Sequence, residues 1–184
     1  MLKSEKKKEE PTNWVIDQIK LIAPKRKIQI LDFASGNGRN TIQLAGKNRI
    51  ITAIDKDSKK LNNYKRLNYI NTICFDLETN KEWPLKNRYY DIIIVVNYLF
   101  RPKIKKLINL LNNGGYLFYE TFSKGNEIFG SPKNPDYLLK DKELINLFSK
   151  KNTILSYFNG KVYERQISIK QRCLIKKTSL KRRL

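Results

Sequence analysis

A run of small and polar residues between two apolar segments is the part of the sequence best suited to bind a ligand. It reads Leu31-Asp32-Phe33-Ala34-Ser35-Gly36-Asn37-Gly38-Arg39-Asn40. An apolar stretch typical of a buried strand precedes the run, and a helical pattern follows it. Gly36 and Gly38 allow a tight turn and the close approach of a ligand to the backbone. The helix after them offers free N–H groups, so the segment predicts a nucleotide-cofactor loop.

Three acidic residues, Asp32, Asp55 and Asp76, are expected at the ends of three successive strands. Open α/β sheets bind ligands at the edge formed by the carboxyl ends of their parallel strands. There Asp55 can bind both hydroxyls of a ribose, Asp76 can take an adenine amino group, and Asp32 can face a positive group. Thr41 occupies the position of the third glycine of a dinucleotide fingerprint. The acids and this missing glycine favour an adenosine ligand without a phosphate.

Each of these acids also has a purely structural explanation. Asp32 could cap its strand, and Asp55 could form the turn that follows it. Glu78 competes with Asp76 for the role at the third strand end. These alternatives stay open at the level of the sequence.

The loop resembles motif I of class I S-adenosylmethionine-dependent methyltransferases. Its continuation, Gly38-Arg39-Asn40, resembles the small bacterial methyltransferases of the tellurite-resistance type. Residues 52–55 look like motif II of these enzymes, residues 90–97 like motif IV, and residues 114–122 like the motif of the fifth strand. The resemblance covers about residues 14–174.

The resemblance implies a methyltransferase whose cofactor is S-adenosylmethionine. Ala34 replaces the usual first glycine of motif I, which a small residue tolerates. The run Asn97-Tyr98-Leu99-Phe100 lacks both prolines of the amino-directed base methylases, which argues against that reaction. The residues implied to line the cofactor site are Asp32, Ala34, Ser35, Gly36, Gly38, Arg39, Asn40, Asp55, Lys56, Asp76, Leu77 and Asn97.

No catalytic residue is identified, but Tyr98, Arg101 and Glu120 are candidates to face the methyl acceptor. An acid inside a strand is costly unless it is paired, so Arg101 or Lys103 is the expected partner of Glu120. Arg101 can grip a carboxylate or phosphate through two hydrogen bonds, although it equally suits a solvated helix start. The loop 123–139, rich in Gly, Pro and Asn, is predicted to form a lid over the acceptor.

Strand and helix patterns alternate along the chain, which predicts the α/β class. The strands are expected at 28–33, 49–55, 70–77, 90–97 and 116–122, and the helices at 13–23, 41–45, 58–67, 102–111 and 141–148. Two more strands, 153–158 and 161–176, flank Asn159-Gly160, a strong hairpin signal. With the resemblance, these patterns predict a Rossmann-like doubly wound seven-stranded sheet, mostly parallel, with a C-terminal antiparallel hairpin. We expect a methyltransferase domain at 13–177, a flexible lead-in at 1–12 and a basic tail at 178–184.

Histidine is absent from the sequence, which holds two cysteines, Cys74 and Cys173. Both lie in expected strands, which favours buried thiols over a disulfide or a metal site. Imidazole catalysis and a structural zinc site are therefore excluded. The longest aliphatic run, 92–96, is too short to span a membrane, and the N-terminus lacks the apolar core of a secretory signal. We expect a cytoplasmic protein that binds neither a metal nor a membrane.

The formal net charge of +21 is compatible with two explanations. Lysine and arginine favour contact with nucleic-acid phosphates, whereas an excess of Lys, Asn and Ile is also typical of an AT-rich coding sequence. A small molecule is the expected acceptor. The alternatives are an RNA- or ribosome-associated methyltransferase, and a non-catalytic basic binding protein with a vestigial cofactor site. The oligomeric state stays open.

Overall fold

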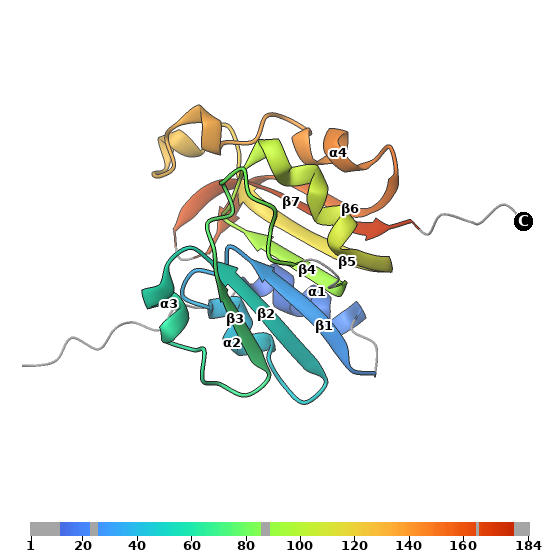
Figure 1. The fold of residues 1–184 in the computed structure, drawn as a ribbon. Coiled ribbons are helices and arrows are strands. Elements are labelled where there is room, and N and C mark those ends of the chain that lie inside the picture. Colours follow the sequence, from blue (N-terminus) through green and yellow to red (C-terminus); the bar gives the residue numbers. More distant parts are fainter. Residues whose placement is uncertain (1–11, 23–25, 86–88, 165, 179–184) are drawn as a thin grey trace, which may run out of the picture.

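The computed structural model describes residues 12–22, 26–85, 89–164 and 166–178. A seven-stranded sheet in the order β3-β2-β1-β4-β5-β7-β6 forms its centre (Figure 1). The first five strands of this order pair in parallel, and β7 runs antiparallel to both β5 and β6. This topology confirms the predicted doubly wound, mostly parallel α/β sheet. The strands are β1 (Ile28–Phe33), β2 (Arg49–Asp55), β3 (Ile70–Cys74), β4 (Tyr90–Val96), β5 (Leu111–Phe122), β6 (Asn152–Tyr163) and β7 (Ile167–Lys177).

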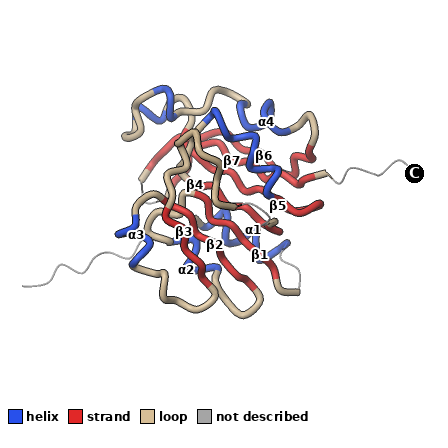
Figure 2. Tube along the Cα trace, in the orientation of Figure 1, coloured by secondary structure: helices blue, strands red, loops and turns tan. Residues whose placement is uncertain are grey.

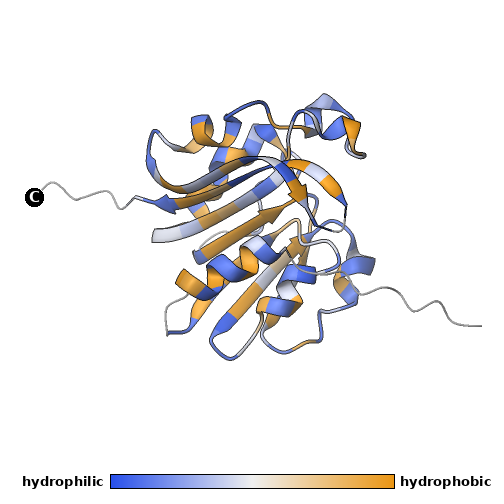
Figure 3. Ribbon diagram, turned by 180° about the vertical axis from the view of Figure 1, so that it is seen from behind, coloured by the Kyte–Doolittle hydropathy of each residue, from blue (hydrophilic) through white to orange (hydrophobic). Residues whose placement is uncertain are grey.

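Helices cover both faces of the sheet (Figure 2). The α-helices are α1 (Asn13–Ile22), α2 (Arg39–Leu44), α3 (Ser58–Asn62) and α4 (Glu143–Phe148), and the 3-10 helices are η1 (Arg101–Leu110), η2 (Asn126–Ile128) and η3 (Pro135–Tyr137). One core cluster joins α1 and α2 to the sheet, and the other joins η1 and α4 to the opposite face. The strands between these layers are largely hydrophobic, as Figure 3 shows from behind. Within the described residues, no helix is long and apolar enough to cross a membrane.

The position of the C-terminal hairpin turn differs from the prediction. Strand β6 continues through Asn159 and Gly160, which pair with Gln171 and Lys170 of β7, and the chain reverses between Tyr163 and Ile167. The long ladder with β7 therefore overrides the local turn preference of Asn-Gly. A Cβ atom on Gly160 would lie 3.1 Å from the Phe158 ring, so the glycine serves close packing inside a strand.

Several other predicted boundaries are also wrong. The expected helix 58–67 is helical only over α3, and the expected helix 102–111 is the 3-10 helix η1. Strand β5 already begins at Leu111, and its register against β4 shifts near Gly114 and Gly115. A Cβ atom on Gly115 would lie 3.0 Å from two backbone oxygens, so a bulge here requires glycine. Cys173 is buried as expected, whereas Cys74, the last residue of strand β3, is exposed.

Most of the expected lead-in and tail lies outside the described residues, which begin at Thr12 and end at 178. Thr12 does not behave as part of a flexible segment. It is buried, and its backbone N–H donates to Asn40 Oδ1 at 2.9 Å. The hydrogen bond ties the start of α1 to the start of α2.

A cluster of charged side chains joins β5 to the hairpin strand β7. Glu120 is completely buried, and its two carboxylate oxygens accept hydrogen bonds from Lys170 Nζ and Arg172 Nε, each at 2.6 Å. Arg172 also pairs with Glu164 at 2.7 Å, close to the hairpin turn. The prediction that Arg101 or Lys103 pairs with Glu120 is therefore wrong. Its partners come from a strand about 50 residues later in the sequence.

This cluster predicts a stability difference between two glutamates. Replacing Glu120 with Gln leaves the charges of Lys170 and Arg172 in a buried site, which should lower the free energy of unfolding by about 3 kcal/mol. Glu164→Gln breaks a pair that is 26% exposed at the glutamate, so it should cost less than about 1 kcal/mol. Urea unfolding of both variants measures these costs. Equal costs would contradict the assigned role of Glu120.

Candidate functional site

A cavity of about 710 Å³ opens at the carboxyl edge of the parallel strands. Its volume lies within the range of small-molecule sites, about 300–1,000 Å³. The loops that follow β1, β2, β3 and β4 form one side, and residues of β5, β7 and the hairpin turn form the other. Its lining contains Ala34, Ser35, Gly36, Asn37, Arg39, Asp55, Lys56, Lys60, Asp76, Leu77, Glu78, Val96, Asn97, Tyr98, Phe122, Glu164, Gln166, Ser168 and Lys170.

The Asp55 carboxylate connects the first two loops of the cavity. Its Oδ2 atom accepts a hydrogen bond from the Gly36 N–H at 2.8 Å, and its Oδ1 atom accepts from the Asp57 N–H at 3.0 Å. Because each carboxylate oxygen has two lone pairs, Asp55 can still accept hydrogen bonds from a ligand. Asp76 follows the next strand and lines the same cavity, where its Oδ1 atom accepts from the Glu78 N–H at 3.0 Å.

Tyr64 supports the glycine loop from the protein interior. The residue is buried, and its hydroxyl group lies 2.9 Å from Ser35 Oγ and donates to the Gly36 carbonyl at 3.2 Å. A Cβ atom on Gly38 would lie 2.5 Å from the Tyr64 ring, whereas one on Gly36 would meet nothing within 4 Å. Gly38 therefore makes room for the supporting ring, and Gly36 leaves space on the cavity side.

Two non-glycine residues of the cavity wall adopt left-handed backbone conformations. Ala34 has φ 60° and Asn97 has φ 57°. Asparagine tolerates this region, but alanine in it costs about 1–2 kcal/mol. Ala34 thus stores backbone strain at the position where the resembled motif has a glycine. Such strain is typical of functional loops that the surrounding structure holds in place.

Asp32, expected to contact the cofactor, lies beneath the loop and does not line the cavity. It is 3% exposed, and its Oδ2 atom accepts a hydrogen bond from Thr41 Oγ1 at 2.6 Å. Burial raises the pKa of this carboxyl from 3.8 to about 6, although the Thr41 hydroxyl opposes the shift. Its observed role is to join the end of β1 to the first turn of α2.

Gly38 and Asn40 were also expected at the cofactor, but neither lines the cavity. Both are buried. Gly38 packs over Tyr64, and Asn40 accepts the hydrogen bond from Thr12. The other predicted cofactor residues lie in the wall of the cavity: Ala34, Ser35, Gly36, Arg39, Asp55, Lys56, Asp76, Leu77 and Asn97.

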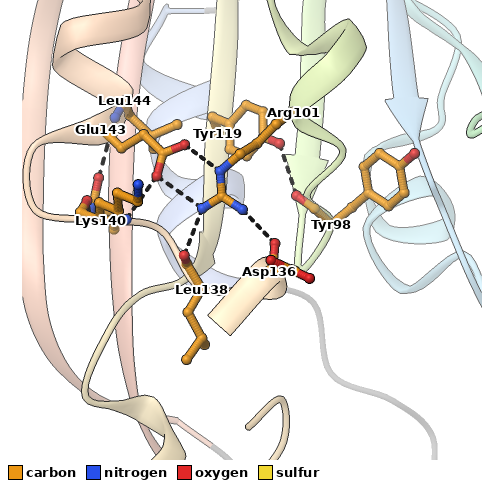
Figure 4. Close-up of polar contacts among 9 residues, drawn as sticks. Tyr98, Arg101, Tyr119, Asp136, Leu138, Lys140, Glu143 and Leu144 are labelled. Atoms are coloured by element: carbon orange, nitrogen blue, oxygen red, sulfur yellow. Dashed lines mark hydrogen bonds and ion pairs between the residues drawn. The ribbon is translucent and has the colours of Figure 1, made fainter. Parts of the chain in front are cut away.

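Arg101 binds a neighbouring segment of the protein and lines neither this cavity nor the smaller one beside it (Figure 4). Its guanidinium donates to both carboxylate oxygens of Glu143, at 2.7 and 3.0 Å. It also donates to the carbonyls of Asp136 and Leu138, at 2.5 and 2.7 Å. Arg101, expected to face the acceptor, thus lies outside both cavities. Its hydrogen bonds hold the end of the 123–139 loop in place.

Of the three residues expected to face the acceptor, Tyr98 alone lines a cavity among the described residues. Glu120 lies behind the wall, in the ion cluster with Lys170. Tyr98 stands between the large cavity and a second one of about 370 Å³, and both cavities share Glu78, Asn97, Tyr98 and Phe122. The Tyr119 hydroxyl group donates to the Tyr98 carbonyl at 2.9 Å, which fixes the backbone there.

Sequence reasoning missed two parts of the site. Tyr64 lay in a segment expected to be a basic helix, where a lone aromatic residue among lysines was the available signal. The wall formed by Glu164, Gln166, Ser168 and Lys170 carried no local signal. Strand β7 brings these residues to the cavity because it runs antiparallel, so that its start lies beside the end of β5.

The described residues contain no group of three or more His, Cys, Asp or Glu side chains that could hold a metal ion. The chain does match a known domain family: residues 30–115 match the methyltransferase domain family. The matched segment contains the glycine loop, Asp55, Asp76 and Asn97. No curated protein matches the sequence.

Three solved structures illustrate the similarity of the fold. TehB from Haemophilus influenzae is 19% identical with a TM-score of 0.71; the match covers 92% of this chain and 63% of that chain. The magnesium protoporphyrin IX methyltransferase ChlM from Synechocystis, solved with bound SAH, is 15% identical with a TM-score of 0.68, covering 90% and 81%. A TehB-like SAM-dependent methyltransferase from Corynebacterium glutamicum is 16% identical with a TM-score of 0.64, covering 88% and 86%. The chain thus spans 63% of the length of TehB.

The contact between Gly38 and Tyr64 predicts unequal effects of two similar substitutions. Gly38→Ala adds a steric clash to an unfavourable φ of 73° and should lower the free energy of unfolding by about 3 kcal/mol. Gly36→Ala, at φ 54° with open space around it, should cost about 1 kcal/mol. Urea unfolding of both variants tests the difference. A larger cost for Gly36→Ala would contradict the supporting role of Tyr64.

The raised pKa of Asp32 predicts a pH-dependent stability. Because its folded pKa exceeds its unfolded value, Asp32 stabilises the fold below about pH 4 relative to higher pH, and this contribution is lost as the pH rises to about 6. Asp32→Asn cannot ionise but can still accept from Thr41. The variant should therefore gain about 3 kcal/mol over the wild type between pH 4 and pH 7. Unfolding curves across this range measure the gain, and a pH-independent difference would contradict the assignment.

Proposed function

We propose that the chain is a class I S-adenosylmethionine-dependent methyltransferase that transfers the methyl group of S-adenosylmethionine to a small molecule. Its fold and the match of residues 30–115 to the methyltransferase domain family support this proposal. The observation that carries this proposal is the cavity edge at which Asp55, Asp76 and the Gly36 loop meet. These groups suit the ribose, the adenine and the amino-acid end of such a cofactor.

The residues of the cavity fit an adenosyl cofactor in three respects. Asp55 keeps lone pairs for the ribose hydroxyls, and Asp76 lies after the neighbouring strand, within the same cavity wall. Gly36 leaves open space where a side chain would stand, so the cofactor can approach the backbone. The acids also complement the positive charge of a sulfonium.

The proposed activity requires little acid–base chemistry from the protein. S-adenosylmethionine, when bound, supplies a methyl group that is already electrophilic. The task of this chain is to hold the acceptor in line with that group and to exclude water, and such positioning can lower a barrier by about 7–11 kcal/mol. This explains how a chain without histidine can be an enzyme.

A small acceptor is favoured by the second cavity beside Tyr98. Its volume of about 370 Å³ suits a small molecule, and it shares Asn97 and Phe122 with the cofactor cavity. We propose that the acceptor approaches across this shared wall. Ser131, Pro132 and Tyr137 of the 123–139 loop line the second cavity.

The proposal predicts that Asp55 is required for binding of S-adenosylmethionine. Asp55→Ala removes the ribose-binding oxygens and also frees the Gly36 loop, so the dissociation constant should rise at least about 100-fold, the equivalent of two hydrogen bonds to a charged group. Isothermal titration calorimetry measures the effect.

A matched control is available two residues away. Asp57→Asn keeps the N-terminal cap of α3, because asparagine also accepts hydrogen bonds from the Lys59 and Lys60 N–H groups. This variant should bind the cofactor as the wild type does. Absence of binding by the wild type, or equal binding by Asp55→Ala, would refute the proposed cofactor site.

A further inference from the structure

The second cavity has an unusual lining for such a basic protein. Its walls are mainly apolar and aromatic, formed by Tyr98, Leu99, Phe122, Pro132 and Tyr137. Among the described residues that line it, Glu78 alone carries a formal charge. The net charge of the whole chain is +21, yet the charge facing this cavity is negative.

Three acids lie near the wall between the two cavities, and Glu164 and the basic Arg39, Lys56, Lys60 and Lys170 also line the large cavity. Glu78 borders both cavities, and Asp76 and Asp55 line the large one. Burial raises the pKa of the Tyr98 hydroxyl, and the charges of these three acids raise it further. The acids are therefore close enough to act on the ring that separates the two cavities. A positive charge placed beside Tyr98 would be stabilised by them.

The Tyr98 hydroxyl group lacks a hydrogen-bond partner among the described residues, although its oxygen atom is buried. A buried polar atom without a partner costs about 1–3 kcal/mol. The backbone of Tyr98 is held by Tyr119, and its ring packs edge-on against Phe33 with the ring centres 5.8 Å apart. The ring is thus fixed in the wall between the two cavities.

From these observations we infer that the second cavity binds an apolar amine, with its hydrocarbon or aromatic part between Leu99, Phe122 and Tyr137 and its nitrogen toward Glu78 and Tyr98. The inference rests on the proposed function, because it names the class of acceptor for that site. Aromatic rings and a carboxylate around a cationic group are a recurrent arrangement for binding amines. An anionic acceptor would be repelled by Glu78.

The transfer to such an acceptor is balanced with the proposed cofactor alone. An amine that binds as the ammonium ion first releases a proton to solvent. The lone pair of the neutral amine then forms the new N–C bond to the methyl carbon, and the S–C bond breaks with its electron pair passing to sulfur. The sulfonium becomes a neutral thioether, and the nitrogen becomes positively charged. The ammonium product then releases a proton to solvent. Glu78 is exposed, so it can stabilise the new charge and stay in contact with solvent.

Three probes of similar size and different charge test the inference. They are 2-phenylethylamine, 2-phenylethanol and 3-phenylpropionate, whose dissociation constants are measured by ligand-observed NMR with and without S-adenosylhomocysteine. The amine should bind at least tenfold more tightly than the alcohol, and the carboxylate should bind most weakly. Equal affinities, or preference for the carboxylate, would overturn the inference.

Variants locate the binding site of the amine. Glu78→Gln should weaken amine binding at least fivefold while changing alcohol binding less than twofold, and Tyr98→Leu, which removes the aromatic ring, should weaken amine binding at least threefold. Glu82→Gln is the control, because Glu82 is exposed, pairs with Lys106 and lines neither cavity. Unchanged amine binding by Glu78→Gln would overturn the inference.

The same preparations separate this inference from the proposed function. Wild-type protein that binds S-adenosylmethionine but shows no preference for the amine retains the proposed cofactor site and loses the amine site. Protein that prefers the amine and fails to bind S-adenosylmethionine retains the amine site and loses the proposed cofactor.

Discussion

The hydrogen bond from the Gly36 N–H to Asp55 connects the two loops on which the site depends. It forms because β1 and β2 run in parallel with Phe33 beside Ile54, so that both strands end at the same edge. The bond fixes the glycine loop to the next strand before any ligand binds. A preformed loop of this kind lowers the entropy that ligand binding must overcome.

The glycine loop is also supported from inside the protein. Tyr64 bonds to the loop carbonyl, Asp32 binds Thr41 at the first turn of α2, and Asn40 accepts from Thr12. Polar groups that suggested direct ligand contact therefore hold the loop in position. Burying Asp32 and keeping Ala34 in a left-handed conformation both cost stability. The core on each face of the sheet offsets these costs.

The far wall of the cavity depends on a different constraint, the antiparallel return of β7. Glu120 in β5 is buried against Lys170 and Arg172 of β7, which fixes the hairpin where its turn borders the cavity. Arg101 also fixes a neighbouring segment, because its hydrogen bonds to Asp136 and Glu143 hold residues 136–143 in place. Both residues had been expected to face the acceptor. A charged residue near a site can thus act by holding the surrounding segments in place, when it pairs with residues distant in the sequence.

The sequence by itself determined the α/β class, the order of the parallel strands' motifs and the edge at which Asp55, Asp76 and the glycine loop meet. It did so because strand periodicity, glycines and strand-end acids are local features, and parallel strands place their ends together. The tertiary structure decided which side chains reach the cavity. Asp32 and Asn40 are buried beneath the loop. The ladder between β6 and β7 places the hairpin turn after Gly160. Arg101 and Glu120 pair with residues distant in the sequence. These outcomes depend on contacts between distant segments, which no local pattern of residues records.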